Sequence, residues 1–402
     1  MFARKMIFVG LAGLVAAASS PGLTQSTRAE LELSGRTFHA AVCAHGNPDG
    51  TARCHSRVVT DSRGNELNGK PNPAAATPAG YGPADLKAAY AIPAGTGTPT
   101  IAIIDAYGYG NAEADLAVYR SQYGLPACTT ANGCFKKVDQ NGGTNYPREN
   151  NGWAQESALD VDMASAACPN CKIVLVEAKT NSFANLGAAV NYAKGISGVR
   201  AISNSYGGSD SSSTTSNDTT YSATNIAITA STGDSGYGAQ YPAAAPGVVA
   251  VGGTSLTAGG AGYTESAWSG AGSGCGLYHP KPSWQNGVTD ACAGRMEGDI
   301  SAVADPNTGV AVYGPNSQRV SSWLVFGGTS VSAPLVGALF ALRNGNINAA
   351  SSIYAHATPT NLHDVTTGSN GTCPVNYYCN AGPGYDGPTG LGTPNGLGAL
   401  SN

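Results

Sequence analysis

The stretch Gly327-Gly-Thr-Ser330-Val-Ser-Ala-Pro334-Leu-Val-Gly-Ala-Leu-Phe-Ala-Leu342 carries most of the information about this chain. Its second half predicts an apolar helix, and proline is tolerated in the first turn of a helix, where backbone N–H groups lack intrahelical partners. Ser330 is therefore expected at a helix N-terminus, whose dipole and free N–H groups suit a developing oxyanion. At this point Ser330 could equally be a nucleophile or an ordinary N-cap serine.

A second Gly-Gly-Thr-Ser sequence, at 252–255, serves as an internal control. It is followed by Leu-Thr-Ala-Gly-Gly, which does not support a helix. We therefore expect no nucleophile there.

Apolar strands alternate with helices on the N-terminal side of Ser330. Strands are expected at 100–105, 172–178, 201–206, 226–231 and 247–252, and helices at 111–123, 153–167 and 182–194. This alternation predicts an α/β fold with a mostly parallel central sheet and helices on both faces.

The first twenty residues have the pattern of a secretory signal peptide. Arg4 and Lys5 precede an apolar run at 6–18 and the small pair Ser19-Ser20. The run is too short for a membrane span, which needs about 20 residues. We expect a secreted protein with a signal peptide at 1–20, a short prosegment and Pro/Ala/Gly-rich linker at 21–79, and a catalytic domain at 80–402. No later stretch predicts a membrane span.

Charge is scarce in this chain. Its 402 residues include 21 Lys+Arg and 25 Asp+Glu, so 11% are charged, against about 25% in typical soluble proteins. A nucleic-acid interface built on basic patches is thus excluded. So few cations also limit self-repulsion in acid. We expect a monomer.

The ten cysteines fall into neighbouring pairs, and export to an oxidising compartment favours disulfides. Cys168 and Cys171 follow a helical stretch and precede a strand, which favours a structural bridge over a redox motif. We expect sequential pairing: Cys43–Cys54, Cys128–Cys134, Cys168–Cys171, Cys275–Cys292 and Cys373–Cys379.

A serine nucleophile needs a base, and a histidine base is improbable here. His279, followed by a proline, is the only histidine between Asp105 and Ser330. Carboxylates could replace it, because Glu156 and Asp160 are four residues apart and share a helix face.

The alternative for the Glu156/Asp160 pair is two solvated acids on a surface helix. Leu159 and Met163 argue against it by marking this helix as packed. A buried pair would share a proton, which couples the two titrations. Asp162 is expected to point elsewhere, since it lies about 240° round the helix from Glu156.

Asp234 follows the strand expected at 226–231. A protonated aspartic acid has one O–H donor for an oxyanion, whereas an ionised one has none. If Asp234 has this role, the enzyme works in acid. The alternative is an ordinary turn aspartate in a Gly-rich loop.

These motifs occur in an ordered set, together with Gly-Tyr-Gly-Pro-Ala-Asp-Leu near 80–86, Ala-Asp-Pro-Asn-Thr-Gly at 304–309 and Gly-Pro-Gly-Tyr-Asp-Gly-Pro-Thr-Gly-Leu-Gly at 382–392. The chain resembles the sedolisins, or serine-carboxyl peptidases, acid-acting relatives of the subtilisins, over roughly 80–402. The resemblance implies a subtilisin-like fold in which Ser330 is the nucleophile, Glu156 its general base, Asp160 the partner orienting Glu156, and Asp234 the oxyanion-hole acid. In some relatives an acid at the position of Asp105 extends this chain of carboxyl groups.

The same resemblance implies one structural Ca²⁺ ion near the C-terminus. Its ligands would be the carboxylates of Asp364 and Asp386 and the carbonyls of Val365, Gly382 and Gly384. All-oxygen ligands with flexible glycine geometry suit calcium better than zinc. From the residues alone, a Gly-rich turn with two stray acids is the better explanation, and it is the resemblance that favours calcium.

The expected activity is that of a secreted, autoprocessed endopeptidase acting on proteins or peptides through an acyl-enzyme on Ser330. Glu156 must be ionised while Asp234 stays protonated, so activity is expected at about pH 3–5. Two alternatives remain: a neutral subtilisin-type peptidase using Asp105 and His279, and a catalytically inactive secreted binding protein on the same scaffold.

Overall fold

The computed structural model describes residues 31–43, 49–69, 77–260, 262–347 and 349–401. The expected signal peptide and the linker residues 70–76 lie outside these ranges. Among the described residues, no helix combines the length and the hydropathy that a bilayer span requires.

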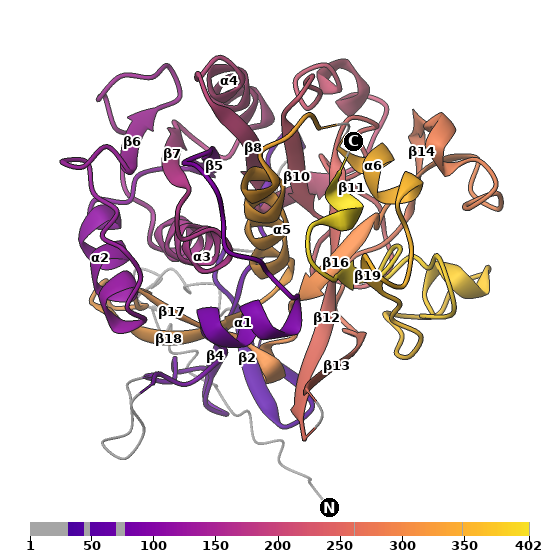
Figure 1. Cartoon of the computed structure of the whole chain (residues 1–402), viewed down its shortest axis with the longest axis horizontal. Coiled ribbons are helices and arrows are strands. Elements are labelled where there is room, and N and C mark those ends of the chain that lie inside the picture. The colour runs from indigo at the N-terminus through magenta and orange to yellow at the C-terminus, as the bar shows by residue number, and fades with distance from the viewer. Residues whose placement is uncertain (1–30, 44–48, 70–76, 261, 348, 402) are drawn as a thin grey trace, which may run out of the picture.

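A central sheet of eight strands dominates the described part of the chain (Figure 1). Its order is β13-β12-β10-β8-β5-β7-β6, with β16 also paired to β12, and every pairing except β12 with β13 is parallel. The strands are β5 (Thr100–Ala106), β6 (Phe135–Asp139), β7 (Lys172–Ala178), β8 (Val199–Asn204), β10 (Ala227–Ser231), β12 (Val249–Gly259), β13 (Gly262–Ala267) and β16 (Ile300–Val303). The expected mostly parallel sheet is confirmed.

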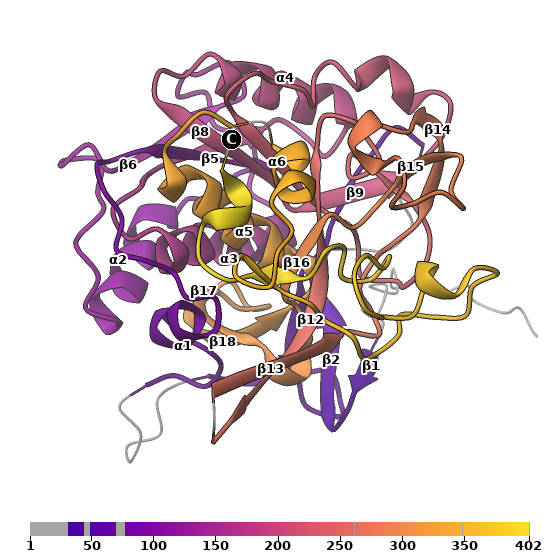
Figure 2. The ribbon, with the colours of Figure 1, turned by 45° about the vertical axis from the view of Figure 1, so that its right-hand side comes forward.

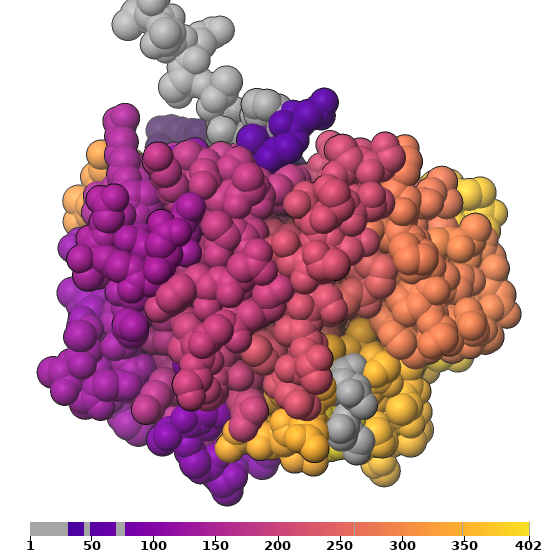
Figure 3. All heavy atoms as spheres, turned by 90° about the horizontal axis from the view of Figure 1, so that it is seen from above, coloured from indigo at the N-terminus to yellow at the C-terminus, as the bar shows by residue number. Residues whose placement is uncertain are grey.

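Helices cover both faces of this sheet. Along β5, Ile101 and Ile103 pack in the core that contains α3 (Asn151–Ala167) and α5 (Thr329–Arg343). Ala102 and Ile104 point the other way, into the core beneath α4 (Phe183–Lys194). Seen from above, the magenta middle of the chain covers the α4 side (Figure 3). Burial on both faces explains why these strands are continuously apolar.

The expected strand at 201–206 divides in two. β8 ends at Asn204 within the central sheet, whereas β9 (Tyr206–Ser209) leaves it and pairs with β3 (Arg53–Cys54) and β11 (Gln240–Tyr241). The predicted strand was therefore wrong in its last two residues. The lack of a side chain at Gly208 lets β9 approach the chain that precedes β3. A Cβ on Gly208 would lie 2.6 Å from the Thr51 carbonyl oxygen.

A second sheet lies below α3 in Figure 1 and was not expected from the sequence. Its order is β1-β2-β4-β18-β17. The strands are β1 (Leu31–Ser34), β2 (Thr37–Ala41), β4 (Arg57–Thr60), β17 (Val310–Pro315) and β18 (Ser321–Gly327). Figure 2 shows β1 and β2, in indigo, beside β12 and β13. The described part of the expected prosegment is therefore built into the domain rather than separate from it.

The remaining elements are short. The helices are α1 (Pro83–Ala89), α2 (Ala112–Gln122) and α6 (Ala350–Ala355), the strands β14 (Cys275–Pro280), β15 (Gly294–Met296), β19 (Leu362–His363) and β20 (Thr393–Pro394), and the 3₁₀ turns Thr214–Asn217, Ser283–Gln285, Pro306–Thr308, Asn376–Tyr378 and Gly398–Leu400.

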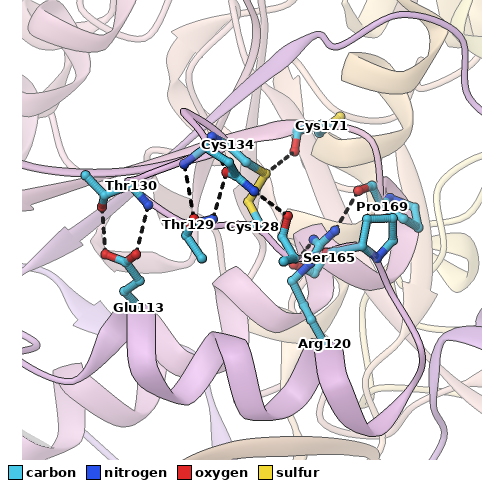
Figure 4. The surroundings of a disulfide bond; sticks show 12 residues. Glu113, Arg120, Cys128, Thr129, Thr130, Cys134, Ser165, Pro169 and Cys171 are labelled. Atoms are coloured by element: carbon cyan, nitrogen blue, oxygen red, sulfur yellow. Dashed lines mark hydrogen bonds between the residues drawn. A yellow bond between two sulfur atoms is a disulfide. The ribbon is translucent and has the colours of Figure 1, made fainter.

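All five expected disulfides are formed. Figure 4 shows the surroundings of Cys128–Cys134, where the buried Arg120 on α2 donates to Ser165 on α3 and to the carbonyl of Pro169. Arg120 thus links α2 to the end of α3, while the disulfide closes the loop between α2 and β6. The Cys168–Cys171 bridge joins the end of α3 to the start of β7, as expected of a structural bridge.

Candidate active site

Ser330 is the second residue of α5 and is fully buried. Its N–H donates to the main-chain carbonyl of His55 at 3.1 Å, and its Oγ donates to the carbonyl of Ser205 at 3.3 Å. The expected helix N-terminus is confirmed, but Pro334 is the sixth helical residue and lies outside the first turn. A proline at that position has no N–H to donate to the carbonyl of Ser330.

Gly328 caps this helix with a φ of +93°, a conformation that L side chains rarely adopt. A Cβ on Gly328 would lie 2.1 Å from the His55 carbonyl oxygen and 2.7 Å from Oδ2 of Asp234. Only glycine leaves room for these two oxygens beside the helix N-terminus.

The second Gly-Gly-Thr-Ser sequence, at 252–255, begins no helix, as predicted. Ser255 lies in β12, not at a helix N-terminus, and its Oγ donates to Asp305 at 2.6 Å. The same four letters thus begin no helix at this place.

The acids Glu156 and Asp160 lie on α3 and are fully buried. Asp105, at the end of β5, joins them and is equally buried. Burial raises the pKa of Glu156 and of Asp160 well above the ordinary carboxyl range, and the charge of Asp105 adds to both shifts. The surface-helix alternative for this pair is therefore wrong.

Burial, opposed by the Ser157 hydroxyl, also raises the pKa of Asp105 to about 7. The hydroxyls of Ser330 and Ser56 lie close enough to Glu156 to oppose the rise of its pKa. Neither hydroxyl is aligned for a hydrogen bond with a Glu156 oxygen. The three carboxyl groups therefore form a desolvated cluster that holds protons at neutral pH.

Asp162 points away from this cluster, as expected. It accepts a hydrogen bond from the N–H of Tyr313 on β17 at 2.9 Å.

Asp234 stands beside the N-terminus of α5. Its Oδ1 accepts hydrogen bonds from the N–H and the hydroxyl of Thr329 at 2.8 and 3.0 Å, while Oδ2 faces Gly328. Burial raises the pKa of Asp234 to about 6 against the opposing charge of Arg57. A carboxyl group with a raised pKa thus lies beside the N-terminus of α5, where it accepts both donors of Thr329.

His279 cannot serve as the base. Its Nδ1 and Nε2 contact Asp218 and Asp210 at 3.0 and 2.9 Å, and its ring stacks on Tyr241. Both ring nitrogens are occupied by these carboxylates, which also raise its pKa against the effect of burial. The interpretation as a subtilisin-type site with His279 as base is excluded.

Sequence reasoning missed His55. A histidine base of the subtilisin type is expected between the first strand of the sheet and Ser330, and His55 precedes that strand. The main-chain carbonyl of His55 accepts from the N–H of Ser330. The His55 ring contacts Ser231 at the end of β10 and Gln240 on β11, at 2.7 and 3.0 Å. No local signal marks such a position, because the contacts span 176 to 275 residues.

The expected calcium ligands lie in a single loop region. The N–H of Gly384 donates to Asp364 at 3.0 Å, and the N–H of Gly382 donates to Asp386 at 3.1 Å. Burial, together with the charge of Asp364, raises the pKa of Asp386 to about 7. No group of three or more His, Cys, Asp or Glu side chains within the described ranges is placed to hold a metal ion. A site here would depend on two carboxylates and main-chain carbonyls.

Comparison with known proteins agrees with this geometry. The chain is 32% identical over 385 residues to kumamolisin of Bacillus sp. (strain MN-32), covering 86% of this chain and 67% of kumamolisin. The chain belongs to the sedolisin family. It is 28% identical to sedolisin of Pseudomonas sp. (strain 101), over 80% of this chain and 60% of that protein.

The fold comparison points to the same sedolisin family. A solved structure of Pseudomonas sedolisin, a serine-carboxyl proteinase complexed with two molecules of pseudo-iodotyrostatin, matches with a TM-score of 0.66 at 26% identity. The match covers 79% of this chain and 95% of that one. No protein-family model matches the chain. Family membership places this chain among the serine-type peptidases, with a subtilisin-like α/β fold.

Proposed function

We propose that this sedolisin-family peptidase is a secreted, acid-acting endopeptidase with Ser330 as nucleophile, Glu156 as general base and Asp234 as oxyanion-hole acid. The observation that carries the proposal is the contact between the N–H of Ser330 and a peptide carbonyl at 3.1 Å, beside Asp234. A peptide carbonyl therefore lies where an oxyanion would develop, next to two groups that can donate to it.

The chemistry follows from these positions. Ser330 Oγ attacks a peptide carbonyl carbon while its proton passes to Glu156, and the N–H of Ser330 and the O–H of neutral Asp234 stabilise the oxyanion. Glu156 then returns the proton to the leaving amine, and water hydrolyses the acyl-enzyme by the reverse sequence. Asp160 and Asp105 hold the cluster's other protons, so that Glu156 can be the ionised member.

The pH range follows from the same groups. Asp234 donates only when protonated, so activity should fall as the pH rises above about 6. On the acid side, activity is lost when the carboxyl cluster becomes fully protonated. Burial raises the pKa of Glu156 in the closed site, so the proposal requires this pKa to fall when water enters the site and exposes the carboxyl group.

Secretion and autoprocessing belong to the proposal. The described disulfides fit an oxidising compartment. Autoprocessing is supported by an N-terminal segment that already reaches Ser330. The division at residues 79 and 80 stays a prediction.

We also propose one structural Ca²⁺ held by the carboxylates of Asp364 and Asp386 with the carbonyls of Val365, Gly382 and Gly384. The residues fit this ion because two carboxylates meet in one Gly-rich loop, where each repels the other's charge. A bound cation would relieve that repulsion and lower the pKa of Asp386. Its removal by a chelator should lower the melting temperature at pH 6.

The catalytic proposal can be tested by digesting a denatured protein at pH 4 and pH 8. Wild type should be active at pH 4 and nearly inactive at pH 8, and Glu156→Gln should be inactive at both because Gln cannot accept the proton. Asp162→Asn is the matched control, since Asp162 is buried on the same helix but faces Tyr313. Equal activity at the two pH values, or an active Glu156→Gln variant, would overturn the proposal.

A further inference from the structure

A fourth buried carboxyl group, that of Glu177, lies beside the carboxyl cluster and has no role in the reaction described so far. Glu177 is the register partner of Asp105 in the parallel pairing of β7 with β5. Ile103 and Leu175, two residues earlier on these strands, both pack in the core that contains α3. Side chains two residues apart on a strand share a face, and neighbouring strands are about 4.8 Å apart. Asp105 and Glu177 are therefore adjacent on the α3 face of the sheet.

The carboxyl group of Glu177 is held at one of its oxygens. Oε1 accepts a hydrogen bond from the N–H of Tyr109 at 2.7 Å and lies 3.4 Å from Nζ of Lys137 on β6. Oε2 of Glu177 and both oxygens of Asp105 are buried and have no aligned hydrogen-bond partner among the described residues. Two adjacent carboxyl groups in such surroundings are not both ionised, because like charges repel and neither is solvated. One of the two therefore keeps a proton.

Cations surround Glu177 and favour the charged form of this member of the pair. Nζ of Lys137 also donates to the carbonyl of Tyr109 at 2.7 Å, which fixes the ammonium group beside Glu177. Glu177 lines a cavity of about 630 Å³ at the ends of β6 and β7, together with Arg148 and Lys179. Burial raises the pKa of Glu177, but the N–H of Tyr109 and the charge of Lys137 oppose this rise.

Two other acids lie near Glu177, and both are bound elsewhere. Glu149 is exposed and accepts a hydrogen bond from the N–H of Gly110 at 2.9 Å, although its charge adds to the rise in the pKa of Glu177. Asp139 is the register partner of Glu177 on β6, but its carboxylate accepts hydrogen bonds from N–H groups of the loop at 141–145. Asp105 is thus the acid that shares the buried surroundings of Glu177.

The position of the negative charge within the cluster decides whether Ser330 can react. Glu156 is the member that lies near the hydroxyl of Ser330. The charge of Asp105 raises the pKa of both Glu156 and Asp160, so an ionised Asp105 would hold the proton on the base. The charge of Glu177 adds to burial in raising the pKa of Asp105 to about 7.

We propose that Glu177 is a positioning residue for this reaction. Lys137 and the N–H of Tyr109 hold its carboxyl group in the charged form. This charge keeps a proton on Asp105 and thereby leaves the negative charge of the cluster to Glu156. The inference rests on the proposed function, in which Glu156 is the base.

A loss of activity that depends on pH is the expected signature. At pH 5, Glu177→Gln should lower kcat for a peptide substrate by about fivefold, because Asp105 can then take the charge that Glu156 needs. At pH 3 the raised pKa leaves Glu177 protonated in wild type as well, so kcat should stay within about twofold. KM should not change, because Glu177 acts through Asp105 and not on the substrate.

Asp139→Asn is the matched control. It removes a negative charge at the same register level, but on the far side of Glu177 from Asp105. Its pH profile should match that of wild type. If Glu177→Gln does not fold because Lys137 loses its partner, the double variant Lys137→Met/Glu177→Gln removes both charges and should show the same loss at pH 5.

Two measurements separate action through Asp105 from a purely structural role. In an Asp105→Asn background, Glu177→Gln should change kcat at pH 5 by less than about twofold, because the competing acid is gone. In a Ser330→Ala background, the infrared band of the protonated Asp105 carboxyl group, identified by its loss in Asp105→Asn, should disappear about one pH unit lower when Glu177 is replaced by Gln.

An equal loss of kcat at pH 3 and pH 5 in Glu177→Gln, or an unchanged titration of Asp105, overturns the inference and spares the proposed function. The same holds if Glu177→Gln lowers kcat in the Asp105→Asn background as much as in wild type. A wild-type enzyme that cuts nothing between pH 3 and pH 6 overturns both.

Discussion

The two Gly-Gly-Thr-Ser sequences at 252–255 and 327–330 have the same letters and different chemistry. In each, the threonine hydroxyl donates to a carboxyl group, Thr254 to the partly buried Glu265 at 2.6 Å and Thr329 to the buried Asp234 at 3.0 Å. The first sequence continues as a strand paired with β13 and β16, and the second begins α5. Of the two, only the helix start has N–H groups without partners in their own element, so the residues after the motif decide its chemistry.

The largest expected difference between the two sites is in activity. Ser330→Ala should lower the rate of peptide hydrolysis at pH 4 by about 10⁴-fold or more, because it removes the nucleophile. Ser255→Ala should leave the rate within about twofold. Initial rates on a denatured protein measure both. Comparable losses in the two variants would contradict the assignment.

The next expected effect is on the free energy of unfolding, through the buried acid Asp105. The pKa of Asp105 is about 7 in the folded protein, against 3.8 as its ordinary value. A raised carboxyl pKa contributes stability that is fully present below pH 3.8 and is lost as the pH rises through 7. That loss amounts to about 4 kcal/mol.

Denaturant unfolding in the Ser330→Ala background measures this contribution without self-cleavage. The unfolding free energy should fall between pH 4 and pH 8, and Asp105→Asn should make this fall smaller because Asn does not titrate, while the other buried acids keep their share of it. A slope unchanged by Asp105→Asn would show that Asp105 is already ionised at pH 4.

A third comparison is between Asp234 and Glu265, the two acids that accept hydrogen bonds from the threonine hydroxyls. Asp234→Ala should lower the rate at pH 4 by about 100-fold through loss of one oxyanion donor. Asp234→Asn keeps an N–H donor at every pH, so its activity should no longer fall above about pH 6. Glu265→Gln, beside the other motif, should keep the wild-type pH profile. A profile of Asp234→Asn that still falls near pH 6 would assign that titration to another group.

The smallest expected effect is at the control site. Ser255→Ala removes one hydrogen bond to Asp305 and should lower the unfolding free energy by about 1 kcal/mol. Thermal or denaturant unfolding in the Ser330→Ala background measures this loss. A loss several times larger would mean that Ser255 holds β12 in place.

Much of the candidate site could be predicted because its signals are local. The helix that carries Glu156 and Asp160 follows from spacing along one segment, and the start of α5 follows from the apolar run after Ser330. His55 could not be found in this way. Its contacts to Ser231, Gln240 and Ser330 come from elements more than 170 residues away.

The sequence by itself determined the alternation of apolar strands and helices that supplies most of the central sheet, the pairing of neighbouring cysteines and the acids available in place of a histidine. These depend on periodicity and on short spacings along the chain. Only the tertiary structure decided that Asp105 joins the buried acids, that β1, β2 and β4 extend the sheet of β17 and β18, and that His55 reaches Ser330. Strand pairing is made by backbone groups that every residue carries, so side-chain patterns do not specify which distant strands meet.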